Sequence, residues 1–325
     1  MSHIVEKIDI KDRKILYELN INARRSNASI GRKVGLGKDL VNRRINKLID
    51  REIIRHFYTM VDATRLGYLS CRLFLKFQYG NPEKEQEIVD FFISHPNTWW
   101  IPSIEGQMDL AVILWAQNTY EFYDIITGVL KKFKPFIKEY IPGIYTRFHQ
   151  YRRAYLLNIK KDYSKSILTC FREKTSFDEI DVGILKLLAK QARMPTIEIA
   201  HRLNLTPSTI TNRINSLMDR KIIQGFRAAL NLKKLGYRWY KVLFDLEDIS
   251  TRYEILQYAR WHPNIVYAYE VIGGHDIELE LEVESHEKLK EIITDLRNRF
   301  SDGIRYSEHF LFYKEHKITY MPMTI

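Results

Sequence analysis

Two stretches of the sequence carry side chains whose types and spacing suit contact with a nucleic acid. Arginine and lysine attract phosphates, while asparagine, serine and threonine can hydrogen-bond to base edges. These types recur at helical spacing in residues 38–47 and again in residues 206–213. The candidates for DNA contact are Lys38, Asn42, Arg43, Arg44 and Lys47 in the first stretch, and Thr206, Ser208, Thr211, Asn212 and Arg213 in the second.

The second stretch indicates which elements would position these side chains. Thr206 followed by Pro207 is typical of a helix N-terminus, and Ile210, Ile214 and Leu217 then form a core stripe. Two helices are expected before it, in residues 181–190 and 196–203, the second capped by Thr196, and residues 222–230 are expected to form a wing. The pattern predicts a winged helix-turn-helix whose third helix fits the DNA major groove.

The first stretch follows the same plan with different chemistry. Val41, Ile45 and Leu48 form its core stripe, and Gly37 stands where the second copy has its capping threonine. Its outward lysines and Arg43 predict stronger electrostatic attachment and a contact to guanine, whereas the second helix would rely on amides and hydroxyls. The two DNA half-sites need not match. A solvated charged face is the competing interpretation, but the helix spacing, the cap and the duplication outweigh it.

Arg44 and Arg213 occupy matching positions and leave two interpretations open. Each could contact a phosphate, or each could pair internally with Asp50 or Asp219.

These stretches belong to a long internal repeat. Residues 12–68 align without a gap onto residues 181–237 with 20 identities in 57 positions, and the match resumes at an offset of 167 from His95-Pro96-Asn97. The chain is therefore two copies of one unit. The predicted division is 1–62 and 178–231 for the heads, 63–148 and 232–325 for the second domains, and 149–177 for a basic connector.

Charge separates the two parts of each copy. The 325-residue chain has a net charge of +11, with +7 in residues 1–60, −2 in 61–145, +6 in the connector region 146–177, +3 in 178–230 and −3 in 231–325. A basic head favours a polyanionic partner. We expect an intracellular, cytoplasmic protein, because no apolar stretch is long enough to cross a membrane and residues 1–13 do not form a signal peptide. Cys71 and Cys170 stand far apart, so neither a disulfide framework nor a metal site is expected.

The second part of each copy has the order β-α-β-β-α-β, which predicts an α+β protein with ferredoxin-like domains. In the first copy the strands are expected in 73–77, 99–104, 110–116 and 137–145, and the helices in 83–92 and 120–133. One sheet face remains to be covered, and pairing of two sheets is the simplest cover. Tyr240, Phe244, Tyr267 and Tyr269 are the predicted residues of that face.

With Leu-Gly-Tyr entering each first strand and Gly-x-x-Asp between the second and third, the chain resembles the Lrp/AsnC family of transcription regulators, twice over. The resemblance implies a DNA-binding regulator that oligomerises through its sheets and binds an amino-acid-like effector near Gly106, Asp109, Gly273 and Asp276. Read without the family, these residues form hairpins, with aspartates accepting bonds from turn amides. Family members usually carry one unit per chain, so the two units could pair internally.

No motif for a catalytic nucleophile, metal or nucleotide is present, so neither an enzyme nor a cofactor is expected. Siroheme decarboxylases nevertheless are similar in architecture, and such an enzyme would need Arg, His and Tyr grouped around tetrapyrrole carboxylates. The candidate groups are His149, Tyr151, Arg152 and Arg153, or Arg55 and His56. A sequence-independent architectural DNA protein is a third alternative. The connector is expected to be a solvated link, and a phosphate-contacting tether through Lys160, Lys161 and Lys165 is its sharper interpretation.

Overall fold

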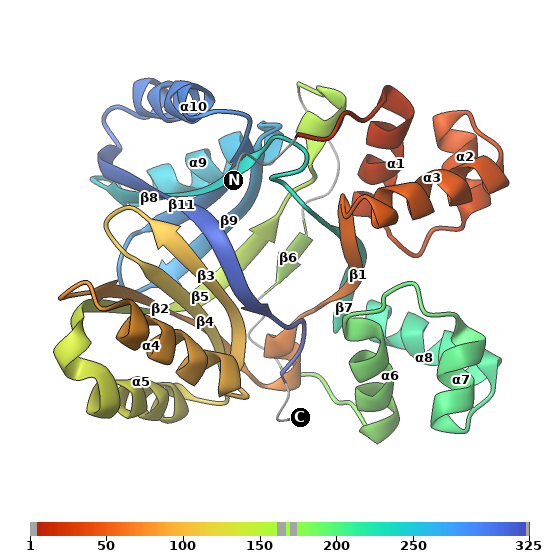
Figure 1. Cartoon of the computed structure of the whole chain (residues 1–325), viewed down its shortest axis with the longest axis horizontal. Helices are drawn as coiled ribbons and strands as arrows, with labels where there is room; N and C mark the ends of the chain where they lie inside the picture. Colours follow the sequence, from red (N-terminus) through yellow and green to blue (C-terminus); the bar gives the residue numbers. More distant parts are fainter. Residues whose placement is uncertain (1–4, 161–166, 170–173, 323–324) are drawn as a thin grey trace.

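The computed structural model describes residues 5–160, 167–169, 174–322 and 325. Figure 1 shows two head domains on one side, a body of strands and outer helices on the other, and the ribbon of β1 and β7 between them. The α+β class and the tandem arrangement predicted from the sequence are confirmed.

Each head is a three-helix unit followed by a strand. The first contains α1 (Ile10–Ile21), α2 (Asn27–Val34), α3 (Lys38–Asp50) and β1 (Ile54–Val61), and the second contains α6 (Glu179–Ala189), α7 (Thr196–Leu203), α8 (Pro207–Asp219) and β7 (Ile223–Leu230). The core stripes of α3 and α8 are buried as predicted. Thr206 caps α8 by accepting a bond from the Thr209 amide. The prediction for Thr196 was wrong: it is the first residue of α7, and Pro195 stands at the N-cap without a side-chain bond.

The two wings pair with each other. β1 and β7 form an antiparallel two-stranded sheet, and each first helix packs on the wing of the other copy. The backbone amide of Ala23 donates to the Phe226 carbonyl (2.8 Å), and that of Ala192 donates to the Phe57 carbonyl (3.0 Å). The wing of each head therefore contacts both heads.

The second parts of the two copies together form one closed barrel. The first copy supplies β2 (Leu69–Phe77), β3 (Thr98–Glu105), β4 (Leu110–Ala116) and β5 (Ile137–Gln150), and the second supplies β8 (Arg238–Leu246), β9 (Ile265–Ile272), β10 (Ile277–Val283) and β11 (Ile304–Ile318). The order is β2-β4-β3-β11-β8-β10-β9-β5, and β5 pairs back onto β2. The short β6 (Ile167–Thr169) pairs antiparallel with the end of β5. Internal pairing of the two units is thus the arrangement of this chain.

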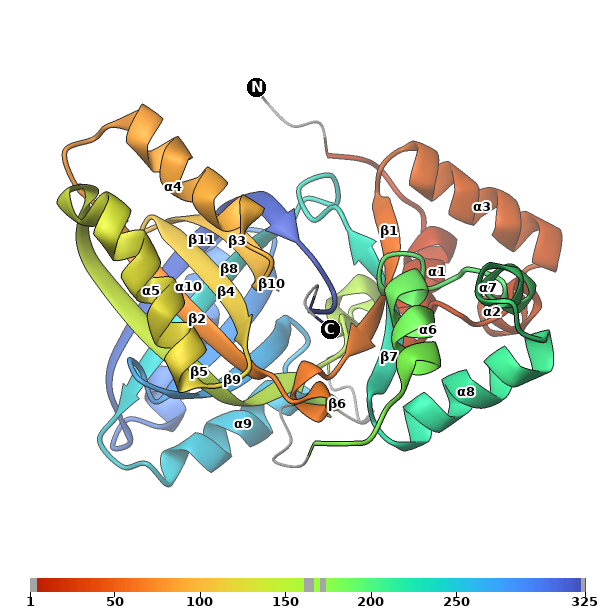
Figure 2. The ribbon, with the colours of Figure 1, turned by 90° about the horizontal axis from the view of Figure 1, so that it is seen from below.

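Helices cover the outside of the barrel, as Figure 2 shows from a second direction. They are α4 (Pro82–Ser94), α5 (Thr119–Phe133), α9 (Thr251–Trp261) and α10 (His286–Arg299). Tyr267 and Tyr269 belong to the cluster inside the barrel. The prediction for Tyr240 and Phe244 was wrong, because they pack with Ile255 and Leu289 under the helices; the alternation of β8 points its neighbours inward instead.

The start of the connector is part of the folded body. β5 continues to Gln150, a short 3₁₀ helix covers Ala154–Leu157, and Arg153 is buried. Lys160 is exposed, whereas Lys161 and Lys165 lie outside the described residues. The division into five segments stays a prediction.

Candidate nucleic-acid interface

We call the third helix of each head, α3 or α8, its reader helix, because the sequence predicts that this helix contacts DNA. The reader helix of the first head, α3, presents a basic face to solvent. Lys38, Arg43 and Lys47 are exposed on α3, and none of the three has an acidic partner within ion-pair distance among the described residues. Asn42 is also exposed, and its Oδ1 accepts a bond from Nδ2 of Asn27 on α2 (3.0 Å). The face is therefore available to a phosphate backbone.

The second reader helix presents hydroxyls and amides. Ser208, Thr211 and Asn212 are exposed on α8, next to the exposed cap residue Thr206. The Thr211 hydroxyl donates to the Pro207 carbonyl one turn earlier (2.9 Å), which leaves its oxygen free to accept. The predicted difference between the two reader faces is present in the structure.

Arg44 and Arg213 have internal partners. Arg44 Nη1 lies 2.7 Å from Asp9 and 2.8 Å from Asp12, and Arg213 Nη1 lies 2.5 Å from Asp178 and 3.4 Å from Asp181. The prediction of Asp50 and Asp219 as the internal partners was wrong. Each arginine instead joins its reader helix to the start of the head's first helix, where Asp9 or Asp178 is the N-cap.

These contacts also set the charge of the caps. The backbone amide of Asp12 and the guanidinium of Arg44 hold the pKa of Asp9 below its ordinary value. The backbone amide of Asp181 and the guanidinium of Arg213 act in the same direction on the pKa of Asp178. Both caps therefore keep their negative charge down to a lower pH than an ordinary aspartate does.

A reciprocal arginine contact holds the heads together. Arg24 Nη1 donates to the carbonyls of Ala192 (2.7 Å) and Met194 (3.0 Å), and Arg193 Nη1 donates to the carbonyl of Ala23 (2.8 Å). Arg24 and Arg193 are equivalent in the repeat, and their heads are related by a pseudo-twofold arrangement. The two reader helices are therefore held in a fixed relation by the turns that precede α2 and α7.

The four predicted effector residues lie at two separate hairpins. Asp109 accepts bonds from the Phe77 amide and Lys76 Nζ, both at 2.8 Å, and Asp276 accepts one from the Leu246 amide (2.8 Å). Gly106 and Gly273 have φ angles of +156° and +88°. Each glycine approaches the last strand of the other copy so closely that a Cβ atom would clash, with Phe310 at Gly106 and with the Pro142 carbonyl at Gly273. The hairpins thus have a structural role, and their aspartates accept bonds from strand amides instead of turn amides.

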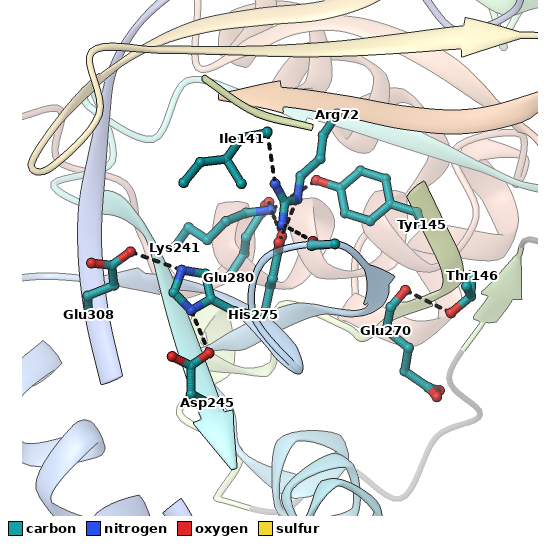
Figure 3. A network of polar contacts seen from close by, with 12 residues as sticks. Arg72, Ile141, Tyr145, Thr146, Lys241, Asp245, Glu270, His275, Glu280 and Glu308 are labelled. Carbon is teal, nitrogen blue, oxygen red and sulfur yellow. Dashed lines mark hydrogen bonds and ion pairs between the residues drawn. The ribbon is translucent and has the colours of Figure 1, made fainter. Parts of the chain in front are cut away.

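The sequence did not indicate the charged network inside the barrel, part of which is drawn in Figure 3. Arg72 Nε lies 2.7 Å from Glu278, and Lys241 Nζ lies 2.8 Å from Glu278 and 3.1 Å from Glu280. All four side chains are buried. The residues 277–283 alternate between apolar residues and glutamates, which resembles a strand with one solvent-exposed face. Only the closure of the barrel turns that face inward.

A second part of the network lies nearer the heads. Arg153 donates to both carboxylate oxygens of Glu282 at 2.8 Å, and the Tyr155 hydroxyl donates to the same group. Three more of the residues proposed for tetrapyrrole carboxylates have protein partners: His149 lies 3.1 Å from Glu270, Arg55 lies 2.6 Å from Glu315, and His56 lies 2.7 Å from the Tyr320 hydroxyl. Tyr151 is buried and Arg152 is half-buried. Within the described ranges there is no group of three His, Cys, Asp or Glu residues that could hold a metal ion.

The fold and the reader faces define a tandem winged helix-turn-helix protein with paired ferredoxin-like domains. A family model described as an AsnC-type helix-turn-helix domain matches residues 8–49, and one described as winged helix-turn-helix DNA-binding matches residues 177–224. An uncharacterized HTH-type transcriptional regulator of Pyrococcus abyssi is 33% identical over 136 residues, which cover 42% of this chain and 85% of that protein. The regulator LrpA of Pyrococcus horikoshii is 30% identical over 131 residues, 39% of this chain and 89% of that protein. The chain belongs to the Lrp/AsnC family of DNA-binding transcription regulators.

The whole-chain arrangement has a solved counterpart. The crystal structure of the siroheme decarboxylase NirDL superposes with a TM-score of 0.64 at 14% identity, over 96% of this chain and 94% of that one. At this identity the likeness concerns the fold. Among the described residues, no helix of this chain is long and apolar enough to cross a membrane.

Proposed function

We propose that this chain regulates transcription by binding a two-part site on double-stranded DNA, with one head on each half. The observation that carries the proposal is the pair of exposed reader faces of different chemistry, basic on α3 and neutral polar on α8. Arg43 would read guanine and the lysines of α3 would contact phosphates, while Asn212 and its neighbours would read through amide and hydroxyl bonds. Because the two reader helices differ in chemistry, we expect the two half-sites to differ in sequence.

The proposal includes three properties that the family resemblance implies: an effector site, assembly into oligomers and a cytoplasmic location. An amino-acid-like effector would bind near the hairpins of Gly106 and Gly273, with Asp109 and Asp276 accepting bonds through the lone pairs that their contacts with Phe77, Lys76 and Leu246 leave unused. Assembly into dimers or larger particles and a cytoplasmic location belong to the same proposal. Failure of every amino acid tested to change the melting temperature or the DNA affinity would contradict the effector part.

A catalytic role is not part of the proposal. Four of the candidate residues for tetrapyrrole carboxylates, His149, Arg153, Arg55 and His56, have protein partners, which supports a non-enzymatic protein. A preparation that gains no absorbance with siroheme would agree with this.

The test is selection of bound sequences from a random DNA pool at two salt concentrations. We expect enrichment of a spaced site with unlike halves. The Lys38→Ala/Lys47→Ala double variant should weaken binding to all sequences and reduce the slope of log affinity against log salt by about two, because about one counterion is released per phosphate contact. Asn212→Ala should relax the preference in one half-site and leave the slope unchanged.

Lys131→Ala, on exposed α5 of the barrel, is the matched charge control and should leave both quantities unchanged. Retention of DNA without sequence enrichment would replace this proposal by the architectural one, and no retention would exclude both.

A further inference from the structure

A chamber lies between the paired wings and the mouth of the barrel. Its inner part is a cavity of about 120 Å³ that reaches Glu280, and its outer part is a groove of about 790 Å³. The two parts are adjacent, because they share the side chains Tyr58, Trp100, Trp239, Tyr267, Ile318 and Tyr320 as a common wall. We call this space the wing–barrel chamber. The outer volume is in the range that holds small organic ligands.

Aromatic rings form the walls of the chamber. Tyr58 of β1 stacks on Tyr320 with a centroid distance of 4.4 Å and an interplanar angle of 16°, and Trp100 stacks on Trp239 at 4.8 Å and 26°. Tyr58, Trp239 and Tyr320 are only partly buried, so part of each ring borders the open space. Parallel and offset rings favour a flat ligand that continues the stack.

The charges at the floor of the chamber are already neutralised. Glu280 is fully buried, accepts a bond from Nε1 of Trp239 (2.9 Å) and pairs with Lys241 at 3.1 Å. Arg72 and Glu278 complete a group of two cations and two carboxylates. This region therefore favours an uncharged ring, since a charged group of the ligand would be buried there without a partner.

The rim of the chamber, unlike its floor, carries positive charges that are not all neutralised. Arg55, Lys233, Arg238 and Lys314 are exposed there, and the carboxylates along the same lining are Glu284 and Glu315. Arg55 pairs with Glu315 (2.6 Å), whereas neither Arg238 nor Lys314 has an ion-pair partner within the part of the chain that the structure describes. The rim therefore favours a negative group.

We propose that the wing–barrel chamber binds a planar aromatic molecule that carries an anionic group, with the ring between the aromatic walls and the anion at the rim beside Arg238 and Lys314. This site is separate from the Gly-x-x-Asp hairpins. It goes beyond the proposed DNA function, and its occupation does not depend on that function.

The test uses the full chain without DNA and two fluorescent probes. 8-Anilinonaphthalene-1-sulfonate has a flat ring system and an anion, and N-phenyl-1-naphthylamine has the same rings without the anion. We expect one molecule of the sulfonate per chain, with blue-shifted dye emission and quenched tryptophan emission. Arg238→Ala/Lys314→Ala should weaken the sulfonate by about fivefold, as for two exposed charge contacts, and leave the uncharged probe unchanged.

Ala229→Trp tests the location. Ala229 is a partly exposed residue of β7 that lines the groove, so an indole there fills the chamber without disturbing a core residue. Both probes should lose at least about tenfold in affinity, which corresponds to 1.4 kcal/mol. Lys131→Ala/Lys138→Ala removes two exposed charges that lie outside the chamber and should change neither probe. Dye binding that survives Ala229→Trp, or an absence of dye binding to the unaltered chain, would overturn the proposal.

Discussion

At the scale of single residues, Arg153 shows what a buried charge requires. Its guanidinium binds the fully buried Glu282 through two hydrogen bonds of 2.8 Å. Burial alone would lower the pKa of Arg153, but the charge of Glu282 outweighs this effect and raises the pKa well above its ordinary value. We expect Arg153→Met to lower the free energy of unfolding by about 3–5 kcal/mol, because an unpaired carboxylate is left in the interior.

Urea unfolding measures this change. Arg147→Met is the matched control: Arg147 also pairs with a glutamate, Glu270, but its side chain is 55% exposed. Its removal should cost less than about 1 kcal/mol. Equal losses of unfolding free energy in the two variants would mean that burial does not increase the contribution of the Arg153 pair to stability.

His275 predicts a pH effect. Burial lowers its pKa, but the hydrogen bonds with Glu308 and Asp245 act in the other direction, and the net pKa is raised. A raised pKa means that the stabilisation is fully present below about pH 6.5, the ordinary value, and is lost as the pH rises through the raised value. The stability difference between the unaltered chain and His275→Gln should therefore be larger at pH 5.5 than at pH 8.5, as measured by urea unfolding. A difference that grows with pH would contradict it.

At the scale of elements, the two reader helices differ at their first residue. Thr206 caps α8, whereas Gly37 precedes α3 with no side-chain bond. Thr206→Ala should cost about 1 kcal/mol of stability, and Gly37→Ser should add a few tenths, because a Cβ at residue 37 meets nothing within 4 Å. Thermal unfolding of both variants checks this, and a loss of stability in Gly37→Ser would show that the backbone there does not suit a serine cap.

The elements also show what the sequence can and cannot predict. Helices such as α8 follow from local signals, a cap and a stripe of Ile210, Ile214 and Leu217, and they were predicted closely. The exchange of wings and the closure of the barrel depend on contacts between residues more than 100 positions apart, such as Thr59 with Leu188. An alternating strand such as β10 has the same pattern whether its glutamates face water or buried cations. Its partners Arg72 and Arg153 lie far from it in the sequence, in the first copy and in the connector.

At the scale of the whole molecule, the two copies form one structure instead of two linked ones. The barrel needs four strands from each copy, and each wing covers the other head. The side chain of Asn20 in α1 accepts a bond from the Arg153 amide (3.2 Å), so the first head is also bonded to the segment that carries the Glu282 pair. One hydrophobic cluster joins Ile15 and Leu16 of the first head to Trp100 and Tyr267 of the barrel.

This continuity predicts a single cooperative unfolding transition. Circular dichroism reports mainly the helices, many of them in the heads, while most tryptophans, among them Trp100 and Trp239, report on the barrel. The two signals should change at the same denaturant concentration. Thr206→Ala in the second head and Arg153→Met beside the first head should shift both curves together. Separate midpoints, with the head variant moving only the helical signal, would mean that the heads unfold independently, and the wing exchange would then not couple the two halves of the molecule.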